Sequence, residues 1–193
     1  SVIAKRALEE GLRGMEFAAG IPGSLGGAAV MNAGAYGGEM KDILRSVRLL
    51  TKDLEIVTMT PRELRMGYRT SIIPREGYTV LGAEIALEEG DREEIAAKME
   101  DLAKQRRDKQ PLEYPSAGST FKRPAGHFAG KLIQDAGLRG YTVGGAQVSE
   151  KHCGFVVNRG GATASDILKL MEDVQRIVEK TSGVLLEPEV RIL

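Results

Sequence analysis

The stretch that decides how the first half of the chain folds lies at residues 20–28 and reads GIPGSLGGA. Its four glycines surround Ser24, near which the small side chains predict a helix that runs to Asn32. Backbone N–H groups at such a helix start form an anion site that suits a phosphate or a pyrophosphate. The spacing matches neither a Walker loop nor a GxGxxG dinucleotide fingerprint, so this motif alone does not identify a ligand.

Glycine is the residue type in clear excess, because 24 of the 193 residues are glycine. That is about 12%, against about 7% in an average protein. Nine glycines lie between Gly11 and Gly38 and ten lie between Gly118 and Gly161, so the excess forms two zones. Such zones indicate either many tight turns in a β-rich fold or two places where the backbone approaches a ligand closely. Composition alone leaves both interpretations open.

The rest of the composition excludes several classes of protein. The 27 basic and 27 acidic residues cancel, which argues against a nucleic-acid binder that works through bulk charge. A single cysteine excludes a disulfide framework and a zinc site built on paired cysteines. No apolar run approaches the ~18 residues of a membrane span, and no leader of charged and then apolar residues opens the chain. We therefore expect a soluble, cytoplasmic protein without a metal, nucleic-acid or membrane partner.

Helices and strands follow one another in mixed order, without the strict alternation of βαβ units, which predicts the α+β class. We expect helices at 1–13, 24–32, 91–110, 129–136 and 163–183, a short helix opened by Thr60-Pro61, and strands at 43–50, 54–59, 78–87, 155–157 and 184–193. A turn-rich segment at 111–124 separates the charged helix from the second glycine zone. We place a domain boundary in that segment.

Two segments carry side chains that suit ligand binding or catalysis. Residues 32–37 read NAGAYG, a wall of small residues with one amide and one ring that suits either a flat ring system or close helix packing. Residues 116–122 read SAGSTFK, in which serine beside glycine is typical of a turn and is also compatible with a positioned proton donor. With only His127 and His152 present and no nucleophile-elbow sequence, a hydrolase triad is poorly supported.

The charged residues near the C-terminus form a further candidate. Residues 187–191 read EPEVR, and because alternate residues of a strand share a side, Glu187, Glu189 and Arg191 are expected on one face. There they either engage a substrate or form a surface ion-pair ladder. Arg69 by itself has the pattern of a surface arginine, and the basic end of the helix at 91–110, with Lys109, that of a solvated helix end.

Five motifs occur in an order that gives the chain a resemblance to a known family. They are the stretch from GMEF at 14–17 to NAGAYG at 32–37, YR at 68–69, SAGSTF at 116–121, KHCGFVVN at 151–158 and EPEVR at 187–191. Together they resemble the UDP-N-acetylenolpyruvoylglucosamine reductase family, flavoenzymes of bacterial peptidoglycan precursor synthesis. The resemblance covers essentially the whole chain. The long insertion with a substrate-covering tyrosine is missing, which indicates the shorter subgroup.

The resemblance implies an oxidoreductase with FAD and NADPH as cofactors. NADPH would reduce the bound FAD, and the reduced flavin would deliver hydride to the enolpyruvyl group of UDP-N-acetylglucosamine enolpyruvate, giving UDP-N-acetylmuramate. The family's proton-donating serine maps onto Ser119, and its catalytic arginine and glutamate map onto Arg69 and Glu189. The distance to Arg191 along the chain favours Glu189 over Glu187. Such a protein serves cell wall biogenesis, and with it cell shape and cell division, in the cytoplasm.

The resemblance also implies binding residues and a domain plan. The substrate would be held by Tyr68, Lys109, His152 and Arg191. The flavin would be held by Ile21, Pro22, Gly23, Ser24, Gly26, Gly27, Ala28, Asn32, Gly34, Ala35 and Tyr36. Residues 1–110 would form part of the FAD-binding domain, 111–183 the smaller α+β substrate-binding domain, and 184–193 a strand that returns to the FAD-binding region.

Two departures from the family pattern affect these expectations. Arg123 stands where some members carry asparagine, so a substrate contact is not carried over to that position. The family normally begins with a further domain that holds part of the FAD pyrophosphate site, and this chain starts after it. The alternative interpretation is therefore a fragment that binds the UDP-sugar but holds no flavin and has no activity.

Overall fold

The computed structural model describes residues 2–192, which divide into two compact units, 2–106 and 107–192. Residue 1 of the predicted helix at 1–13 and residue 193 of the predicted strand at 184–193 lie outside the described residues. Each unit combines helices with small antiparallel sheets and has its own hydrophobic core. This arrangement confirms the α+β class. The sequence predicts a domain boundary after residue 110. In the structure the division falls after Arg106, within the helix Arg92–Lys109.

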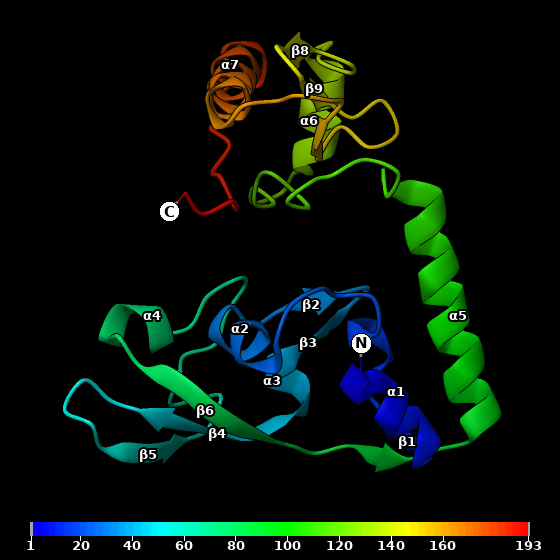
Figure 1. Ribbon diagram of the computed structural model, residues 1–193, viewed down its shortest axis with the longest axis vertical. Helices are drawn as coiled ribbons and strands as arrows, with labels where there is room; N and C mark the ends of the chain where they lie inside the picture. Colours follow the sequence, from blue (N-terminus) through cyan, green and yellow to red (C-terminus); the bar gives the residue numbers. More distant parts are fainter. Residues whose placement is uncertain (1, 193) are drawn as a thin grey trace. The chain divides into compact units, whose positions relative to one another are not determined.

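The first unit contains three sheets and the greater part of the long helix (Figure 1). Its elements in chain order are α1 (Val2–Glu9), β1 (Leu12–Arg13), η1 (Glu16–Ala18), α2 (Leu25–Val30), β2 (Gly34–Ala35), β3 (Gly38–Glu39), α3 (Met40–Ile43), β4 (Leu44–Leu50), β5 (Ile56–Met59), α4 (Ile73–Glu76), β6 (Thr79–Ile85), β7 (Glu88–Glu89) and α5 (Arg92–Lys109), which crosses into the second unit.

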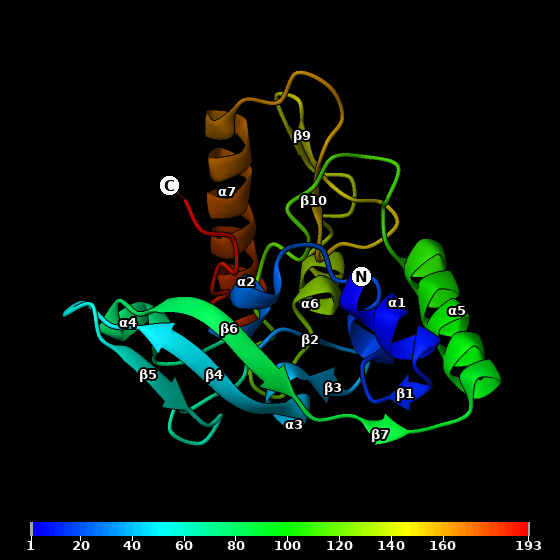
Figure 2. The ribbon, with the colours of Figure 1, turned by 60° about the horizontal axis from the view of Figure 1, so that its bottom comes forward.

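The central strand of the first unit is β4, which pairs with β5 on one side and β6 on the other. Val47 and Leu49 of β4 are completely buried, because alternate residues of a strand face the core. The short helix α2 packs against β6, and both ribbon views show it on that side of the sheet (Figure 1 and Figure 2). The core therefore holds α2 and the glycine-rich stretch before it against the sheet.

The second unit packs two helices against one three-stranded sheet. Its elements are α6 (Ala129–Asp135), β8 (Thr142–Val143), β9 (Ala146–Val148), β10 (Val156–Asn158) and α7 (Ala164–Ser182), and the strand order is β10-β9-β8. A capping box opens α7, because Thr163 Oγ1 accepts from Asp166 N at 3.1 Å while Asp166 Oδ2 accepts from Thr163 N at 2.8 Å. Leu170, Val174 and Val178 of α7 are fully buried in the core.

Two predicted elements are wrong in detail. The helix expected at Thr60-Pro61 is a single turn, because Arg65 adopts a left-handed φ of +48° that ends it. The strand expected at 184–193 is reduced, among the described residues, to one isolated bridge between Phe121 and Pro188. Its hydrogen bonds run to residues 120 and 122 of the second unit.

The hairpin of β8 and β9 is a further element, which was not among those expected from the sequence. Two glycines, Gly144 and Gly145, connect the two strands, and a Gly-Gly pair between apolar residues is a hairpin signal that was available in the sequence. The two strands span only two and three residues, which is too short for an alternating pattern of apolar residues to show.

The buried carboxylate of Asp173 links α7 to Tyr141, which lies outside that helix. Asp173, with only 7% of its side chain exposed, accepts hydrogen bonds from Arg176 at 2.8 Å, Lys169 at 3.0 Å and Tyr141 at 3.1 Å. The bonds from Arg176, Lys169 and Tyr141 lower the pKa of Asp173 from its ordinary 3.8 to about 2. A folded-state pKa below the unfolded one means that the ionised group stabilises the fold above pH 3.8. That stabilisation is lost as the pH falls through about 2.

We therefore predict that Asp173→Asn lowers the melting temperature strongly at pH 7, and that its difference from the wild type shrinks between pH 4 and pH 2. Thermal unfolding followed by circular dichroism at pH 7, 4 and 2.5 measures this. Asp135→Asn is the matched control, since Asp135 pairs with Lys131 on an exposed helix face and such pairs contribute little. A gap for Asp173→Asn that is constant with pH contradicts the prediction.

Candidate functional site

The glycine-rich stretch forms the entry to α2 and one wall of a cavity. Ser24 caps the helix, its Oγ accepting from Gly27 N at 3.1 Å. The N–H groups of Leu25 and Gly26, in the first turn, have no acceptor among residues 2–192. Beside them is a cavity of about 210 Å³, whose lining includes five of the predicted flavin residues: Ile21, Pro22, Gly23, Ser24 and Ala28.

The β2–β3 hairpin next to this stretch is held unusually close by glycine. A Cβ on Gly34 would lie 2.6 Å from the carbonyl oxygen of Gly38 and 2.9 Å from Cγ of Glu39, so only glycine fits there. Ala35, also predicted to contact the flavin, pairs with Gly38 in this hairpin and is half-buried. The sequence singled out this segment for its small residues, and the close approach of the two strands is the reason they are small.

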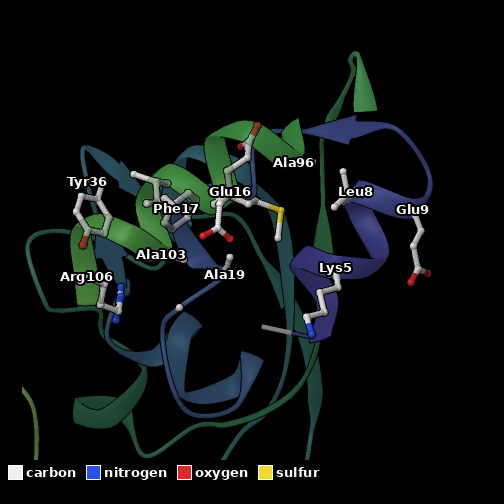
Figure 3. A pocket seen from close by; sticks show the side chains of 14 residues that line it. Lys5, Leu8, Glu9, Glu16, Phe17, Ala19, Tyr36, Ala96, Ala103 and Arg106 are labelled. Carbon is white, nitrogen blue, oxygen red and sulfur yellow. The ribbon is translucent and has the colours of Figure 1, made fainter. Parts of the chain in front are cut away.

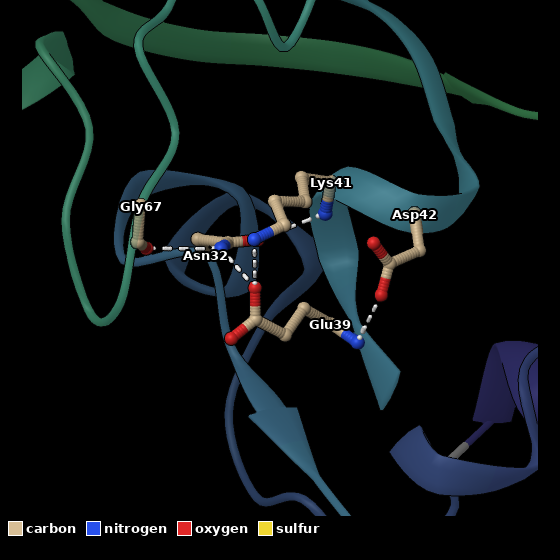
Figure 4. Close-up of polar contacts among 5 residues, drawn as sticks. All are labelled: Asn32, Glu39, Lys41, Asp42 and Gly67. Atoms are coloured by element: carbon tan, nitrogen blue, oxygen red, sulfur yellow. Dashed lines mark hydrogen bonds and ion pairs between the residues drawn. The ribbon is translucent and has the colours of Figure 1, made fainter. Parts of the chain in front are cut away.

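Asn32 lies under this wall and does not form its surface (Figure 4). It is 0% exposed, and its Nδ2 donates to Glu39 Oε2 at 3.0 Å and to the carbonyl oxygen of Gly67 at 2.9 Å. Its Oδ1 accepts from Lys41 N at 2.8 Å. The contact of Asn32 with a flavin stays a prediction, and in this structure every polar atom of its side chain is bonded within the protein.

Arg69 occupies a strained position in a tight turn that contacts the hairpin. Gly67 and Thr70 exchange backbone hydrogen bonds of 3.1 and 3.3 Å, and between them Arg69 adopts a φ of +54°, which normally favours glycine. Its Nη2 donates to the carbonyl oxygen of Gly34 at 2.8 Å, and its guanidinium lies 5.3 Å from the ring centroid of Tyr68. Strain of this kind accumulates at functional sites.

Tyr36 and Arg106 close one end of a larger cavity, of about 470 Å³, between α1, η1 and α5 (Figure 3). The guanidinium of Arg106 lies 5.9 Å from the Tyr36 ring centroid, and its Nε would be 2.7 Å from a Cβ on Gly20. Gly20 is therefore glycine because Arg106 packs against it. This contact links α5 to the glycine-rich stretch, a role that the sequence did not reveal for Arg106.

Ser119 lies in the second unit on an irregular segment between two others. It bridges Phe155, its neighbour Thr120 donates to the carbonyl oxygen of Gly154 at 2.9 Å, and Glu189 N donates to the carbonyl oxygen of Thr120 at 2.9 Å. These bonds bring the predicted residues Ser119 and Glu189 together. The Ser119 side chain is exposed, and its hydroxyl has no hydrogen-bond partner within the described part of the chain.

The two candidate carboxylates differ in their surroundings. Glu187 forms an ion pair with Lys122 and exposes 68% of its side chain. Glu189 is half-buried, and its backbone is fixed beside Thr120. Arg191 is exposed at the end of the described chain, as is Lys109 at the end of α5. Glu187 is thus engaged by Lys122, while the backbone of Glu189 is held one residue from Ser119.

His152 packs against Phe155 edge to face, with the two ring centroids 5.0 Å apart. Its Nδ1 accepts from Gly154 N at 3.1 Å, and burial lowers the pKa of His152. The imidazole is therefore neutral at pH 7 and offers Nε2–H as a hydrogen-bond donor. The neighbouring Cys153 is buried, and burial raises the pKa of its thiol, which makes it unreactive.

Metal binding and membrane insertion are two further classes of function to consider. Residues 2–192 hold no cluster of three or more His, Cys, Asp and Glu side chains that suits a metal ion. None of the described helices combines the length and apolar character that crossing a bilayer requires.

Comparison with known proteins places these features in a family. The family described as UDP-N-acetylenolpyruvoylglucosamine reductase, C-terminal domain, matches residues 110–193, and the FAD binding domain family matches residues 3–60. A crystal structure of UDP-N-acetylenolpyruvylglucosamine reductase from Thermus caldophilus superimposes with a TM-score of 0.85 and 38% identity, over 99% of this chain and 69% of that chain. The chain belongs to the UDP-N-acetylenolpyruvoylglucosamine reductase family.

Curated members of the UDP-N-acetylenolpyruvoylglucosamine reductase family are closer in sequence. The protein of that name from Lachnoclostridium phytofermentans is 62% identical over all 193 residues, and that from Agathobacter rectalis is 60% identical. The chain spans 62% of the length of each of these relatives. The resemblance inferred from five sequence motifs is thus confirmed at the level of the family.

We predict that Arg69→Gly is more stable than Arg69→Ala by about 1 kcal/mol, because both lose the side chain but only glycine adopts a positive φ without strain. Urea unfolding of the two variants measures the difference. Arg75, in helix α4, is the matched control, where the order reverses and alanine is the more stable by about 1 kcal/mol. Equal stabilities at position 69 would show that the turn is unstrained.

Proposed function

We propose that the protein to which this chain belongs is an NADPH-dependent flavoenzyme that reduces UDP-N-acetylglucosamine enolpyruvate to UDP-N-acetylmuramate in peptidoglycan precursor synthesis. The observation that carries this proposal is the exposed hydroxyl of Ser119, which has no hydrogen-bond partner among residues 2–192, in a chain of this family. The relatives' names state the reductase activity, and the chain supplies the side chains that such a reaction needs. NADPH and nucleotide sugars favour a cytoplasmic protein.

The first unit fits one part of a bound FAD. The apolar wall at residues 21–28 and the two free amides at the start of α2 suit a flat ring and a phosphate respectively. Small residues let such a ligand approach the backbone, and Tyr36 adds an exposed ring 5.9 Å from Arg106. We infer that Ile21, Pro22, Gly23, Ser24, Gly26, Gly27, Ala28, Gly34, Ala35 and Tyr36 contribute to this wall.

Bound FAD would supply hydride transfer from NADPH to the enolpyruvyl double bond. Negative charge then develops on the neighbouring carbon and on the substrate carboxylate. Arg69 stabilises that charge through its guanidinium. The Ser119 hydroxyl donates the proton to the carbon that carries the charge, and Glu189 polarises or relays that proton.

Four further residues are proposed to bind the substrate. Lys109 and Arg191 are exposed cations that suit the diphosphate and the carboxylate. Neutral His152 donates a hydrogen bond without adding charge, and the Tyr68 ring, 48% exposed, offers a face for stacking. We infer that residues 1–110 form part of the FAD-binding domain and 111–183 the substrate-binding domain, with 184–193 contributing Glu189 and Arg191.

The visible spectrum of the purified chain separates this proposal from the alternative of a UDP-sugar-binding fragment. Absorption near ~450 nm after reconstitution with FAD indicates that the first unit retains the flavin. A colourless chain that still binds the UDP-sugar favours the fragment interpretation for these 193 residues, and the activity assays below then need the full-length protein.

In the full-length protein we predict that Ser119→Ala leaves NADPH-dependent flavin reduction intact and lowers product formation by about 10²–10⁴-fold, the usual contribution of a general acid. Stopped-flow absorbance follows the first step, and chromatography of the UDP-sugars follows the second. Ser116→Ala is the matched control in the same segment, since the Ser116 hydroxyl donates to the carbonyl oxygen of Val156 at 2.8 Å and has a structural role. Product formation by Ser119→Ala at the wild-type rate contradicts the assignment.

A second pair of variants tests which carboxylate acts. Glu189→Gln is expected to lower kcat by about 10²-fold, because the resemblance to the family assigns the catalytic carboxylate to Glu189. Glu187→Gln is expected to change kcat less than about twofold, since it breaks only an exposed ion pair with Lys122. Steady-state kinetics of both variants measures this, and the reverse order would move the role to Glu187.

A further inference from the structure

Glu39 is a charged residue that the proposed reaction leaves without a role. It ends β3, precedes α3, and pairs with Lys41 at 2.6 Å. Its side chain is 24% exposed, less than the 41% of Lys41 and less than half the exposure of the surface glutamates Glu84 and Glu88. A carboxylate placed only for a surface ion pair does not need this burial.

The first connection from Glu39 runs through Asn32 (Figure 4). The same Nδ2 of Asn32 donates to Glu39 Oε2 at 3.0 Å and to the carbonyl oxygen of Gly67 at 2.9 Å. Gly67 opens the turn in which Arg69 is held at a positive φ. The carboxylate of Glu39 and the turn that presents Arg69 are thus two ends of one buried amide bridge.

The second connection runs through the hairpin. Gly34 and Glu39 are opposite each other in the β2–β3 pairing, and Cγ of Glu39 would be 2.9 Å from a Cβ on Gly34. The carbonyl oxygen of Gly34 accepts the hydrogen bond from Arg69 Nη2 at 2.8 Å. Glu39 therefore packs against the residue whose carbonyl receives the Arg69 side chain.

Charge acts in the same direction as these contacts. Lys41, the Asn32 amide and the positive charge of Arg69 lower the pKa of Glu39, so its carboxylate is ionised at neutral pH. An anion beside this turn attracts the guanidinium and compensates for the strain at position 69.

We propose that Glu39 is a positioning residue that, with Asn32, fixes the guanidinium of Arg69. This proposal rests on the role proposed above for Arg69, and it adds a residue to which no contact with substrate or flavin is assigned. Without Glu39 the turn keeps its backbone and the bond from Asn32 to Gly67, but it loses the anion and the second partner of the Asn32 amide. The guanidinium of Arg69 would then be held less firmly.

The test measures solvent exchange of the Arg69 guanidinium protons by NMR, in this chain labelled with nitrogen-15 arginine. The spectrum of Arg69→Lys identifies the signal. Glu39→Gln keeps the shape of the side chain and removes its charge, and we expect the exchange rate to rise about tenfold. Glu88→Gln, which breaks an exposed pair with Arg13, is the matched control and is expected to leave the rate unchanged.

Unchanged Arg69 exchange in Glu39→Gln would overturn the proposal, and so would an equal rise in Glu88→Gln. Lys41→Met removes the other partner of Glu39 and is expected to leave Arg69 protected; a tenfold rise there would show that only the general stability of the hairpin matters. If Glu39→Gln does not fold, Glu39→Asp, which withdraws the carboxylate by one methylene, carries the same test.

Activity of the full-length protein separates this proposal from the proposed function. Glu39→Gln is expected to lower kcat about tenfold while KM for NADPH stays constant, because only the orientation of Arg69 changes. If the wild-type protein has no reductase activity, the proposed function fails, and the guanidinium exchange rates alone decide the role of Glu39. If the wild type is active and kcat of Glu39→Gln equals its kcat, the positioning role is overturned while the function stands.

Discussion

The first unit depends on one buried amide. Asn32 has no exposed surface, adopts a φ of +47°, and uses both polar atoms of its side chain to join the hairpin at 34–39, the backbone of Lys41 and the turn at Gly67. An unpaired amide at this depth would be costly, so the three segments are fixed relative to one another as long as Asn32 is satisfied. The strained turn of Arg69 is tolerable because its surroundings are determined in this way.

In the second unit the exposed hydroxyl of Ser119 lies on a segment without regular structure. Residues 119–122 lie between Gly154 and Phe155 on one side and residues 187–189 on the other, through single bridges and hydrogen bonds. Buried Thr120 and Phe121 anchor the segment, while Ser119 remains exposed. The backbone of a loop is thus made rigid by its neighbours, which is a requirement for a side chain that must meet a ligand in one orientation.

Much of this could be predicted from the sequence, for identifiable reasons. The helix beginning near Ser24, the strands at 43–50 and 54–59, and the helix at 163–183 depend on local patterns, and all are confirmed. The predicted C-terminal strand is wrong, because only one bridge forms there among the described residues. The burial of Asn32 could not be predicted, because nothing in NAGAYG indicates which residue faces inward.

By itself the sequence determined the family, the α+β class and the chain positions of Ser119, Arg69 and Glu189, because these depend on the order and spacing of motifs. Only the tertiary structure decided that Asn32 is buried and that Glu187 forms an ion pair with Lys122. It also decided that Glu39 shares the Asn32 amide with Gly67, which opens the turn of Arg69. Those are contacts between segments about 7 to 65 residues apart in the chain. Burial and pairing at such separations are set by packing, which no local pattern records.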